Sequence, residues 1–358
     1  MRNILKYSGV LLSLYAGVVQ AEVKDDETVI LFPTSGHISR HNQWIIPLHG
    51  WLYEYDADSL WREAGVLALR KSLQLNNIEM DNELFRQRAW MFLVDNKRGR
   101  KIQITLLGKS FECQRSKPNG HFIGEATIST IDVSPAQQPI WVSYEVVINN
   151  SDKRRFSGES QLLSRQGLSV ISDIDDTIKD SHVTDKSELL KSTFLQEFRA
   201  VDGMAKVYNQ WQADGAAFHY LSASPWQLFP PLAAFVRDNG FPKGDFYLRQ
   251  FRIKDRSFYS LFESPYEYKT KIISQILHNF PERKFVLVGD NTESDPQAYA
   301  SIAKRFPKNI VKILIRNATG HIDRVKIDTA FGGVDPGLWM VFNNAEELSR
   351  LRFDIGAN

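Results

Sequence analysis

The sequence predicts a mixed α/β protein with two domains: a β-rich, sandwich-like domain followed by one built on a parallel sheet. From Val29 to about Leu163, short alternating apolar runs are separated by Gly, Pro and Asn, a pattern typical of antiparallel strands. After Leu163, strand-like runs alternate with helical ones, which indicates a parallel sheet. Because 358 residues are enough for two domains, we place the β-rich domain at residues 22–165 and the α/β domain at residues 166–358.

Residues 1–21 have the features of a secretory signal peptide. Arg2 and Lys6 give a charged start, residues 7–18 a short apolar core, and residues 19–21 a small-x-small cleavage site. The apolar core is shorter than the ~20 residues that a membrane-spanning helix needs. We therefore expect an exported protein, periplasmic or secreted, with an uncleaved anchor as the alternative.

Cysteine content and charge exclude two arrangements. Cys113 is the only cysteine, so an intramolecular disulfide is impossible, and it lies too far from the signal to carry an N-terminal lipid anchor. The formal net charge is +2, and removal of the signal takes away Arg2 and Lys6 but no acidic residue, which leaves a charge of 0. This balance gives no support to nucleic-acid binding, and we expect no nucleic-acid partner.

The β-rich half contains strand-like runs and one helical run, Ser59–Leu73, whose apolar residues share a face. His37, His41 and His49 lie among strand and loop signals, and we interpret them as ordinary polar histidines. The basic cluster Lys97–Lys101 is at a hairpin tip, either as a solvated turn or as a contact for an anionic surface. The strand-like runs are Trp44–Pro47, Ala89–Val94, Ile102–Leu107, Phe122–Ser129 and Ile140–Val147.

The α/β half alternates strands with helices. The predicted strands are Leu168–Ser172, Ala216–Leu221, Phe246–Leu248, Phe285–Val288, Ile310–Ile315 and Trp339–Phe342. The predicted helices are Met204–Ala213, Gln227–Arg237, Lys269–Asn279, Pro296–Arg305 and Ala345–Leu351. Ligands of such sheets bind outside the carboxyl ends of the strands, so the residues that follow each strand are the candidates for a site.

The first of these strands ends in three carboxylates and a hydroxyl, at Asp173, Asp175, Asp176 and Thr177. Asp173 and Asp175 project to the same side because side chains alternate along a strand. Two carboxylates a few ångströms apart repel by about 4 kcal/mol at an effective dielectric constant of ~20, so a bound cation or a shared proton must relieve them. Both arrangements suit phosphoryl transfer, in which one Asp attacks phosphorus and the other carries a proton.

Two other interpretations of this motif are weaker. A calcium-binding EF-hand loop needs Gly at its sixth position and Glu at its twelfth, where this chain has Ile178 and Thr184. A simple cap at the start of a helix would explain Asp and Thr residues here, but it would not explain the polar residues at the other strand ends.

Those other strand ends carry a hydroxyl, a lysine and two further carboxylates. Ser222 follows the second strand, just before a helix, where a hydroxyl can donate to a phosphate oxygen. Asp290 and Asp295 follow the fourth strand, and Gly289 allows a tight exit from it. Lys269 is predicted at the start of a helix, where a cation is poorly placed against the helix dipole, so we expect it to have an anionic partner.

These residues resemble the four motifs, in order, of the haloacid dehalogenase superfamily of phosphotransferases. The segments ISDIDDTIKDSHV, GMAKVYNQW, FHYLSASPWQL and FVLVGDNTESDPQAY look like the catalytic domain of the actin-patch-associated phosphatidate phosphatases, with the lipins as more distant relatives. The resemblance covers nearly all of the second half. It implies a Rossmann-like parallel sheet of the haloacid dehalogenase type.

By this resemblance, Asp173 is the nucleophile that forms an aspartyl-phosphate and also binds Mg²⁺. Asp175 protonates the leaving alkoxide and then activates water, which requires a raised pKa that burial and crowding beside Asp173 can supply. Asp175 also offers its backbone carbonyl to the metal, Asp290 is a further ligand, and Asp295 binds through water or orients the ligands. Mg²⁺ suits such a set because it prefers few carboxylates, retained waters and a phosphate oxygen.

The resemblance also assigns phosphate-binding and supporting residues. Ser222 and Lys269 hold the transferred phosphoryl group, whose negative charge must be neutralised during transfer. Asp176 and Thr177 shape the turn and support the ligands.

The segments around the site bear on the substrate. The insertion Ile178–Asp202 and the loop Arg249–Tyr268 are both too short for a large cap domain, so the site admits a phosphate on a bulky or membrane-embedded molecule. Together with this open site, the resemblance implies Mg-dependent hydrolysis of phosphatidate. The loop mixes basic and aromatic side chains, which either contact an anionic membrane surface or pack on their own domain. The alternatives are a phosphatase for a soluble or nucleic-acid-end phosphomonoester, and a lipid- or glycan-binding protein with a vestigial phosphatase fold.

Overall fold

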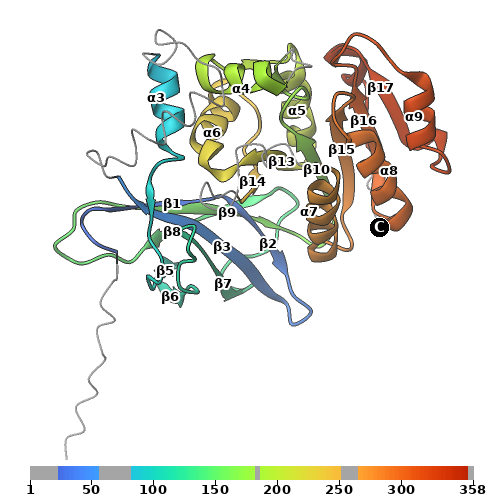
Figure 1. The fold of residues 1–358 in the computed structure, drawn as a ribbon. Coiled ribbons are helices and arrows are strands. Elements are labelled where there is room, and N and C mark those ends of the chain that lie inside the picture. The colour runs from blue at the N-terminus through green and yellow to red at the C-terminus, as the bar shows by residue number, and fades with distance from the viewer. Residues whose placement is uncertain (1–22, 56–81, 182–185, 251–264, 354–358) are drawn as a thin grey trace, which may run out of the picture.

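The computed structural model describes residues 23–55, 82–181, 186–250 and 265–353 (Figure 1). The predicted signal at residues 1–21, the predicted helix Ser59–Leu73 and residues 251–264 of the basic and aromatic loop lie outside the described residues. None of the helices in the described ranges is long and apolar enough to cross a membrane.

The second half of the chain forms a six-stranded sheet in which every neighbouring pair is parallel. Strand β10 lies inside this sheet between β13 and β15, so three carboxyl-terminal strand ends meet around its last residue, Asp173. In sheet order the strands are β14 (Asp245–Arg249), β13 (Ala217–Pro225), β10 (Leu168–Asp173), β15 (Lys284–Asp290), β16 (Ile310–Arg316) and β17 (Trp339–Phe342).

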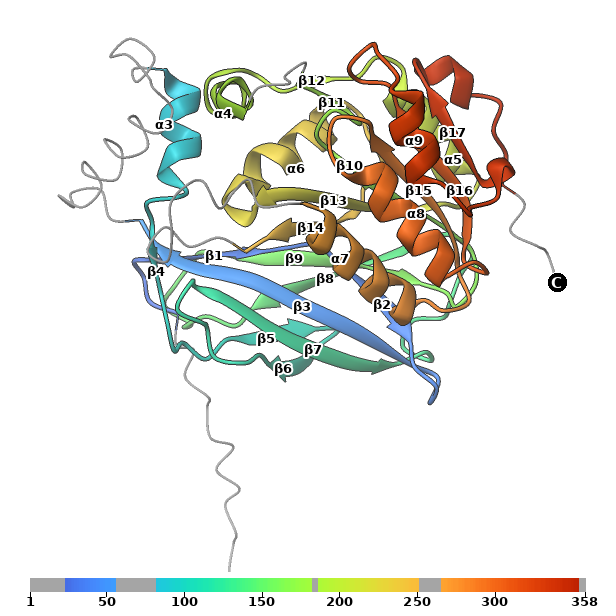
Figure 2. The ribbon, with the colours of Figure 1, turned by 45° about the vertical axis from the view of Figure 1, so that its right-hand side comes forward.

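Helices cover both faces of this sheet, because its strands alternate between two cores. Val170 of β10 packs in the core shared with α5 and α6, whereas Ile171 packs in the core shared with α7, α8 and α9. Figure 2 shows α7 and α8 on one side of the sheet. The helices are α5 (Met204–Ala213), α6 (Phe229–Asp238), α7 (Pro265–Asn279), α8 (Asp295–Arg305) and α9 (Arg324–Ala330).

The predicted α/β elements are present, with shifts at their ends. Helix α5 has the predicted bounds, and α7 begins four residues before the predicted start at Lys269. The predicted helix Ala345–Leu351 is only a short 3₁₀ turn, Ala345–Leu348. Ala345 and Leu348 are its buried residues, and a spacing of three matches a 3₁₀ turn better than an α-helix.

The first half of the chain forms a nine-stranded sheet around a separate core. Its long strand β3 (Gln43–Glu54) pairs with β1, β2, β4 and β7, and alternate residues such as Trp44 and Ile46 are buried in that core. Hydrogen bonds join all nine strands in one sheet, so the sandwich-like arrangement stays a prediction. The other strands are β1 (Glu27–Leu31), β2 (Thr34–Ile38), β4 (Asp95–Asn96), β5 (Gln103–Leu106), β6 (Lys109–Glu112), β7 (His121–Ser129), β8 (Ile140–Val146) and β9 (Ser157–Leu163).

The prediction of a strand at Ala89–Val94 is wrong, because helix α3 (Glu83–Trp90) occupies its first part. The Asn82 side chain caps this helix by accepting from the backbone N–H groups of Leu84 and Phe85. Phe85 and Ala89, four residues apart, are both buried in the core shared with α5 and α6. Helical spacing of apolar residues, with a cap before it, therefore determines this segment.

The two sheets pack directly against each other. Phe32 of the first half lies 4.1 Å, between ring centroids, from Trp226, which follows β13. Ser35 Oγ donates to Asp245 Oδ2 over 2.5 Å, and Gln161 Nε2 donates to Asp245 Oδ1 over 3.3 Å, so a buried polar network crosses the same interface. The chain passes from one sheet to the other between β9 and β10. The division at residues 165 and 166 stays a prediction, since the halves share a core.

Candidate active site

The strand ends bring the predicted residues into one buried cluster. Asp173 ends β10 and Asp290 ends β15, while Asp295 is the first residue of α8. Ser222 lies on β13, the other neighbour of β10, and Lys269 projects from the second turn of α7. Asp173, Ser222, Lys269, Asp290 and Asp295 are each at most 2% exposed.

Lys269 has the anionic partners that its position predicted. Its Nζ lies 2.7 Å from Asp173 Oδ1 and 3.2 Å from Glu293 Oε2, and it also donates to Asp295 Oδ1. Burial disfavours the charge of Lys269, but the carboxylates, Asp173 first, outweigh it and raise the pKa of Lys269 well above its usual range. Lys269 is therefore a permanent buried cation that ties α7 to the end of β10.

Asp173 has one oxygen held and one oxygen unpaired. Oδ1 contacts Lys269, whereas no donor in the described part of the chain reaches the buried Oδ2. Burial raises the pKa of Asp173 well above its usual range, with Lys269 acting against it and Asp295 adding to it. An unpaired buried carboxylate oxygen is costly, so Oδ2 is placed for a ligand such as a cation or a phosphorus centre.

Asp290 and Asp295 add two more buried carboxylates. Asp290 accepts from the backbone N–H of Thr292 over 2.6 Å and from the Thr292 hydroxyl, and Thr177 Oγ1 lies 3.5 Å from its Oδ2. Burial, followed by the charge of Asp295, raises the pKa of Asp290 to about 8. Burial raises the pKa of Asp295 as well, against the charge of Lys269.

These carboxylates fit a divalent cation. Asp173, Glu293 and Asp295 can each offer an oxygen, and these three atoms lie within 4.8 Å of one another. The cluster contains several buried carboxyl groups around a single cation, Lys269, and Asp173 Oδ2 has no other partner among the described residues. Such an all-oxygen set is what Mg²⁺ or a similar hard cation prefers. Asp290 is a buried neighbour of these three residues but does not belong to the group whose oxygen atoms lie this close together.

Asp175 has an environment different from that of Asp173. Its Oδ1 lies 2.6 Å from Lys179 Nζ, and its Oδ2 accepts from the hydroxyls of Ser222 and Ser224 over 3.0 and 3.3 Å. The expectation of a raised pKa is wrong for the substrate-free protein. Burial does raise the pKa of Asp175, but the Lys179 charge and these hydrogen bonds outweigh it and lower the pKa below its usual value.

Sequence reasoning placed the predicted site residues at one end of the sheet but missed three neighbours: Lys179, Ser224 and Glu293. Glu293 lies between Asp290 and Asp295 in the sequence, so a count of acidic residues in that loop would have found it. Ser224 follows Ser222 by two residues. Lys179 gave no comparable signal, because its contact depends on the backbone turn at Asp176.

The turn that brings Lys179 to Asp175 is centred on Asp176. Asp176 has a φ of 53°, in the left-handed region that few non-glycine residues adopt. Its side chain accepts from the backbone N–H of Ser181 over 2.9 Å, and its carbonyl accepts from Arg316 over 2.8 Å. Asp176 therefore shapes the backbone between the strand end and Lys179.

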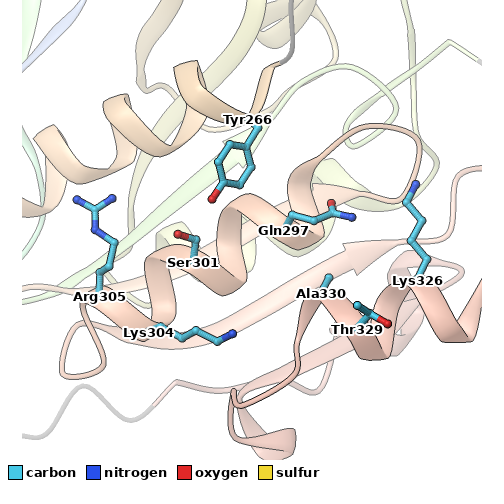
Figure 3. Close-up of a pocket in the computed structure, with 8 residues that line it drawn as sticks. All are labelled: Tyr266, Gln297, Ser301, Lys304, Arg305, Lys326, Thr329 and Ala330. Carbon is cyan, nitrogen blue, oxygen red and sulfur yellow. The ribbon is translucent and has the colours of Figure 1, made fainter.

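A separate hollow of about 570 Å³ lies between α7, α8 and α9. Figure 3 shows Lys304, Arg305 and Lys326 around it, with Tyr266, Gln297 and Ser301. The buried carboxylates do not line it. Lys304, Arg305 and Lys326 are all exposed. Because none of the buried carboxylates lines this hollow, it is not part of the candidate site.

Residues 168–317 match the family model described as "Phosphatidate phosphatase APP1, catalytic domain". These residues are similar to a catalytic domain of this type. The match runs from the start of β10 to the residue after β16, so it contains Asp173, Ser222, Lys269, Asp290 and Asp295. The matched stretch therefore has these residues at the strand ends described above.

Two curated relatives align with 168 residues, or 46% of the chain. Phosphatidate phosphatase APP1 of Saccharomyces cerevisiae is 37% identical, and an uncharacterised protein of Schizosaccharomyces pombe is 32% identical. The aligned stretch covers 28% and 27% of their lengths, so the chain spans little more than a quarter of either relative.

Among solved structures, a class C acid phosphatase from Bacillus anthracis aligns over 52% of this chain and 74% of its own. The identity is 13% and the TM-score 0.26, which is too low to establish a shared fold.

Proposed function

We propose that this protein is an exported, Mg²⁺-dependent phosphatidate phosphatase of the haloacid dehalogenase type, which hydrolyses phosphatidate to diacylglycerol and phosphate. The observation that carries the proposal is the buried pair Asp173–Lys269 with Asp173 Oδ2 left unpaired, inside a domain of the APP1 catalytic type. A carboxylate with one oxygen fixed by a cation and the other presented to a ligand is the arrangement that nucleophilic attack on phosphorus needs.

In the first step, a carboxylate oxygen of Asp173 attacks phosphorus and forms an aspartyl-phosphate. The bond between phosphorus and the leaving glycerol oxygen breaks, and that oxygen takes a proton from Asp175. In the second step, water attacks phosphorus and gives a proton to Asp175, the Asp173–phosphorus bond breaks, and phosphate leaves. The proton on Asp175 is thus restored at the end of each cycle.

The lowered pKa of Asp175 is a property of the substrate-free protein. A phosphate group that enters beside Asp175 brings negative charge within a few ångströms, which raises the pKa of this carboxyl toward the protonated form that the first step requires. Ser222, which donates to Asp175 over 3.0 Å, can then turn its hydroxyl to a phosphate oxygen.

Lys269 and the acidic residues stabilise the transferred phosphoryl group in different ways. Lys269 is fixed by α7 and lies against Asp173, so its charge is in place before the substrate binds. A cation held by Asp173, Glu293 and Asp295, with Asp290 beside them, would neutralise phosphate charge and orient the phosphorus in line with Asp173.

The lipid substrate, export and peripheral contact with an anionic membrane are parts of this proposal. The phosphatidate phosphatase activity after which the yeast relative is named supports the lipid substrate, and the sequence of residues 1–21 supports export. Fractionation of cells that express the full chain tests export: a periplasmic or secreted product shortened by about 21 residues is expected. A full-length cytoplasmic product would contradict it.

A phosphate-release assay tests the activity. We expect phosphate from phosphatidate in mixed micelles, loss of release with a chelator, and recovery with Mg²⁺. Asp173→Asn should abolish release, whereas Asp238→Asn, at an exposed surface ion pair, should not change it. Release only from soluble monoesters would favour the alternative phosphatase, and no release from any substrate would favour a binding protein.

A further inference from the structure

Lys179 is a buried cation that none of the four motifs contains. It is 3% exposed, and its Nζ lies 2.6 Å from Asp175 Oδ1. The other oxygen of Asp175 accepts from Ser222 and Ser224. Three donors from two segments therefore fix this carboxylate in one orientation, and Lys179 is the charged one among them.

The backbone around Lys179 brings it back to Asp175. The left-handed turn at Asp176 reverses the chain, and the Asp176 N–H donates to the carbonyl of Lys179 over 2.8 Å. Lys179 then belongs to the short strand β11 (Lys179–Asp180), which pairs with β12 (Arg199–Ala200). The position of Lys179 thus depends on β12 and on the segment that leads into it, residues 191–198.

Helix α3 of the β-rich half holds that segment. Arg88 Nη1 donates to the carbonyls of Thr193 and Gln196, both over 2.6 Å, at the carboxyl end of α4 (Lys186–Leu195). The Arg88 guanidinium carbon lies 4.0 Å from the centroid of the Phe198 ring. Lys179 Nζ lies 4.7 Å from the same centroid, so both cations contact one ring.

We propose that Lys179 is a positioning residue for Asp175, and that Arg88 of the β-rich half sets the position of Lys179 through Phe198. The inference rests on the proposed function, because it concerns the proton that Asp175 gives to the leaving oxygen. This transfer needs a donor within about 2.6–3.2 Å of that oxygen. A carboxylate that has lost its charged contact samples other orientations and reaches this geometry less often.

The leaving group separates positioning from a general loss of structure. A nitrophenolate leaves without a proton, whereas an alkoxide needs one, so misplacement of Asp175 penalises alkyl phosphates more than nitrophenyl phosphate. The quantity to compare is kcat/KM, which covers steps through the formation of the phosphoenzyme and excludes its hydrolysis. A purely structural defect lowers kcat/KM for both substrates by the same factor.

The experiment measures kcat/KM of the full mature chain for p-nitrophenyl phosphate and glycerol 3-phosphate. We expect Lys179→Met to lose about tenfold more on glycerol 3-phosphate than on p-nitrophenyl phosphate, the size typical of one charge-assisted hydrogen bond. The exposed Lys308→Met is the matched control and should leave both values unchanged. Equal losses on the two substrates in Lys179→Met would overturn the proposal.

Arg88→Met tests the connection between the halves. It should show the same preference for the nitrophenyl substrate, and the double variant with Lys179→Met should show no larger ratio than Lys179→Met alone, since both act through Asp175. The role of Arg88 would be contradicted if Arg88→Met had the same ratio of the two kcat/KM values as the parent. It would also be contradicted if the effects of Arg88→Met and Lys179→Met on this ratio were fully additive.

Failure of this inference differs from failure of the proposed function. A parent protein that releases no phosphate from any substrate contradicts the proposed function. In that case the readout is a crystal structure of Lys179→Met, or of Lys179→Gln if the first does not fold. We expect Asp175 to leave its parent orientation, and an unchanged orientation would contradict the positioning role.

Discussion

Lys269 Nζ lies 2.7 Å from Asp173 Oδ1 in a site where both side chains are at most 3% exposed. The pair joins α7 to the end of β10, while Asp173 Oδ2 stays unpaired among the described residues. In the proposed reaction, the same lysine then contacts the phosphoryl group that Asp173 receives. The predictions that follow test the pair, the acidic cluster around it and the supporting structure.

Lys269→Met should lower both the catalytic activity and the free energy of unfolding. The substitution leaves Asp173 and Asp295 buried without their cation, a change that typically costs about 3–5 kcal/mol in the free energy of unfolding. Loss of one preorganised positive group should lower kcat at least about a hundredfold. Urea unfolding and phosphate release measure the two effects. Stability equal to that of the parent in a chelator would contradict the buried ion pair.

Asp290→Asn should stabilise the metal-free protein at pH 8 while it impairs activity. The pKa of Asp290 is about 8 in the folded protein and lies near the usual carboxyl value when unfolded, because burial and Asp295 disfavour its charge. A carboxyl group whose pKa is higher in the folded than in the unfolded protein stabilises the folded state at low pH. This contribution to the free energy of unfolding is lost as pH rises from about 4 to 8. Asn carries no such charge.

Thermal unfolding in a chelator at pH 5 and pH 8 measures this effect. The parent should lose stability between the two values, and Asp290→Asn should lose less. Mg²⁺ should restore the parent more than the variant. A variant less stable than the parent at pH 8 would show that the Asp290 contacts with Thr292 outweigh the charge.

Gly289→Ala should disturb the acidic cluster through contact alone. A Cβ at Gly289 would lie 2.3 Å from Asp295 Oδ2 and 2.7 Å from the ring of Tyr299, so Asp295 must move. We expect a higher Mg²⁺ requirement and a loss of about 1–3 kcal/mol in the free energy of unfolding. Gly337→Ala, whose Cβ would meet nothing closer than 3.4 Å, is the control. An unchanged Mg²⁺ requirement would place the cation elsewhere.

The strand ends of this site could be predicted from the sequence because their residue types are informative by themselves. A buried apolar run that ends in Asp173, and a glycine before Asp290, indicate a site at the edge of a parallel sheet without further structure. Parallel pairing of β10 with β15 then brings the ends of these two strands to the same edge of the sheet. The anionic partner expected for Lys269 is confirmed.

The environment of Asp175 could not be predicted in the same way. Its low pKa depends on Lys179, which reaches it only through the left-handed turn at Asp176. The residues before β12, which pairs with the strand of Lys179, are in turn held by Arg88. Arg88 is distant in sequence and lies on a helix that was not predicted, α3. Local periodicity contains no information about such contacts between separate halves of the chain.

His121→Gln should reduce the loss of stability that the protein shows when the pH falls below about 6.5. His121 Nδ1 lies 3.0 Å from His49 Nε2, and burial, followed by the charge of Lys117, lowers the pKa of His121 to about 3. The unfolded chain takes up a proton near pH 6.5, but the folded chain does not. The free energy of unfolding should therefore fall by up to about 1.4 kcal/mol per pH unit as pH drops below about 6.5.

Urea unfolding at pH 7 and pH 5, with a chelator present, checks this prediction. The parent should lose more stability than His121→Gln between the two values, and His321→Gln, at an exposed position, should behave like the parent. Identical losses in the parent and His121→Gln would show that His121 does not stay neutral in the fold.

The most direct test of the central claim is to locate the phosphoryl group during turnover. Asp175→Asn is incubated with Mg²⁺ and p-nitrophenyl phosphate labelled in its phosphate, because its leaving group needs no proton from residue 175. The protein is then quenched in acid, digested and analysed by mass spectrometry. We predict a phosphoryl group on the carboxylate of Asp173, because the variant lacks the group that activates water for the second step. The double variant with Asp173→Asn should retain no label. A label on another residue, or phosphate release by Asp173→Asn at the parent rate, would contradict the account.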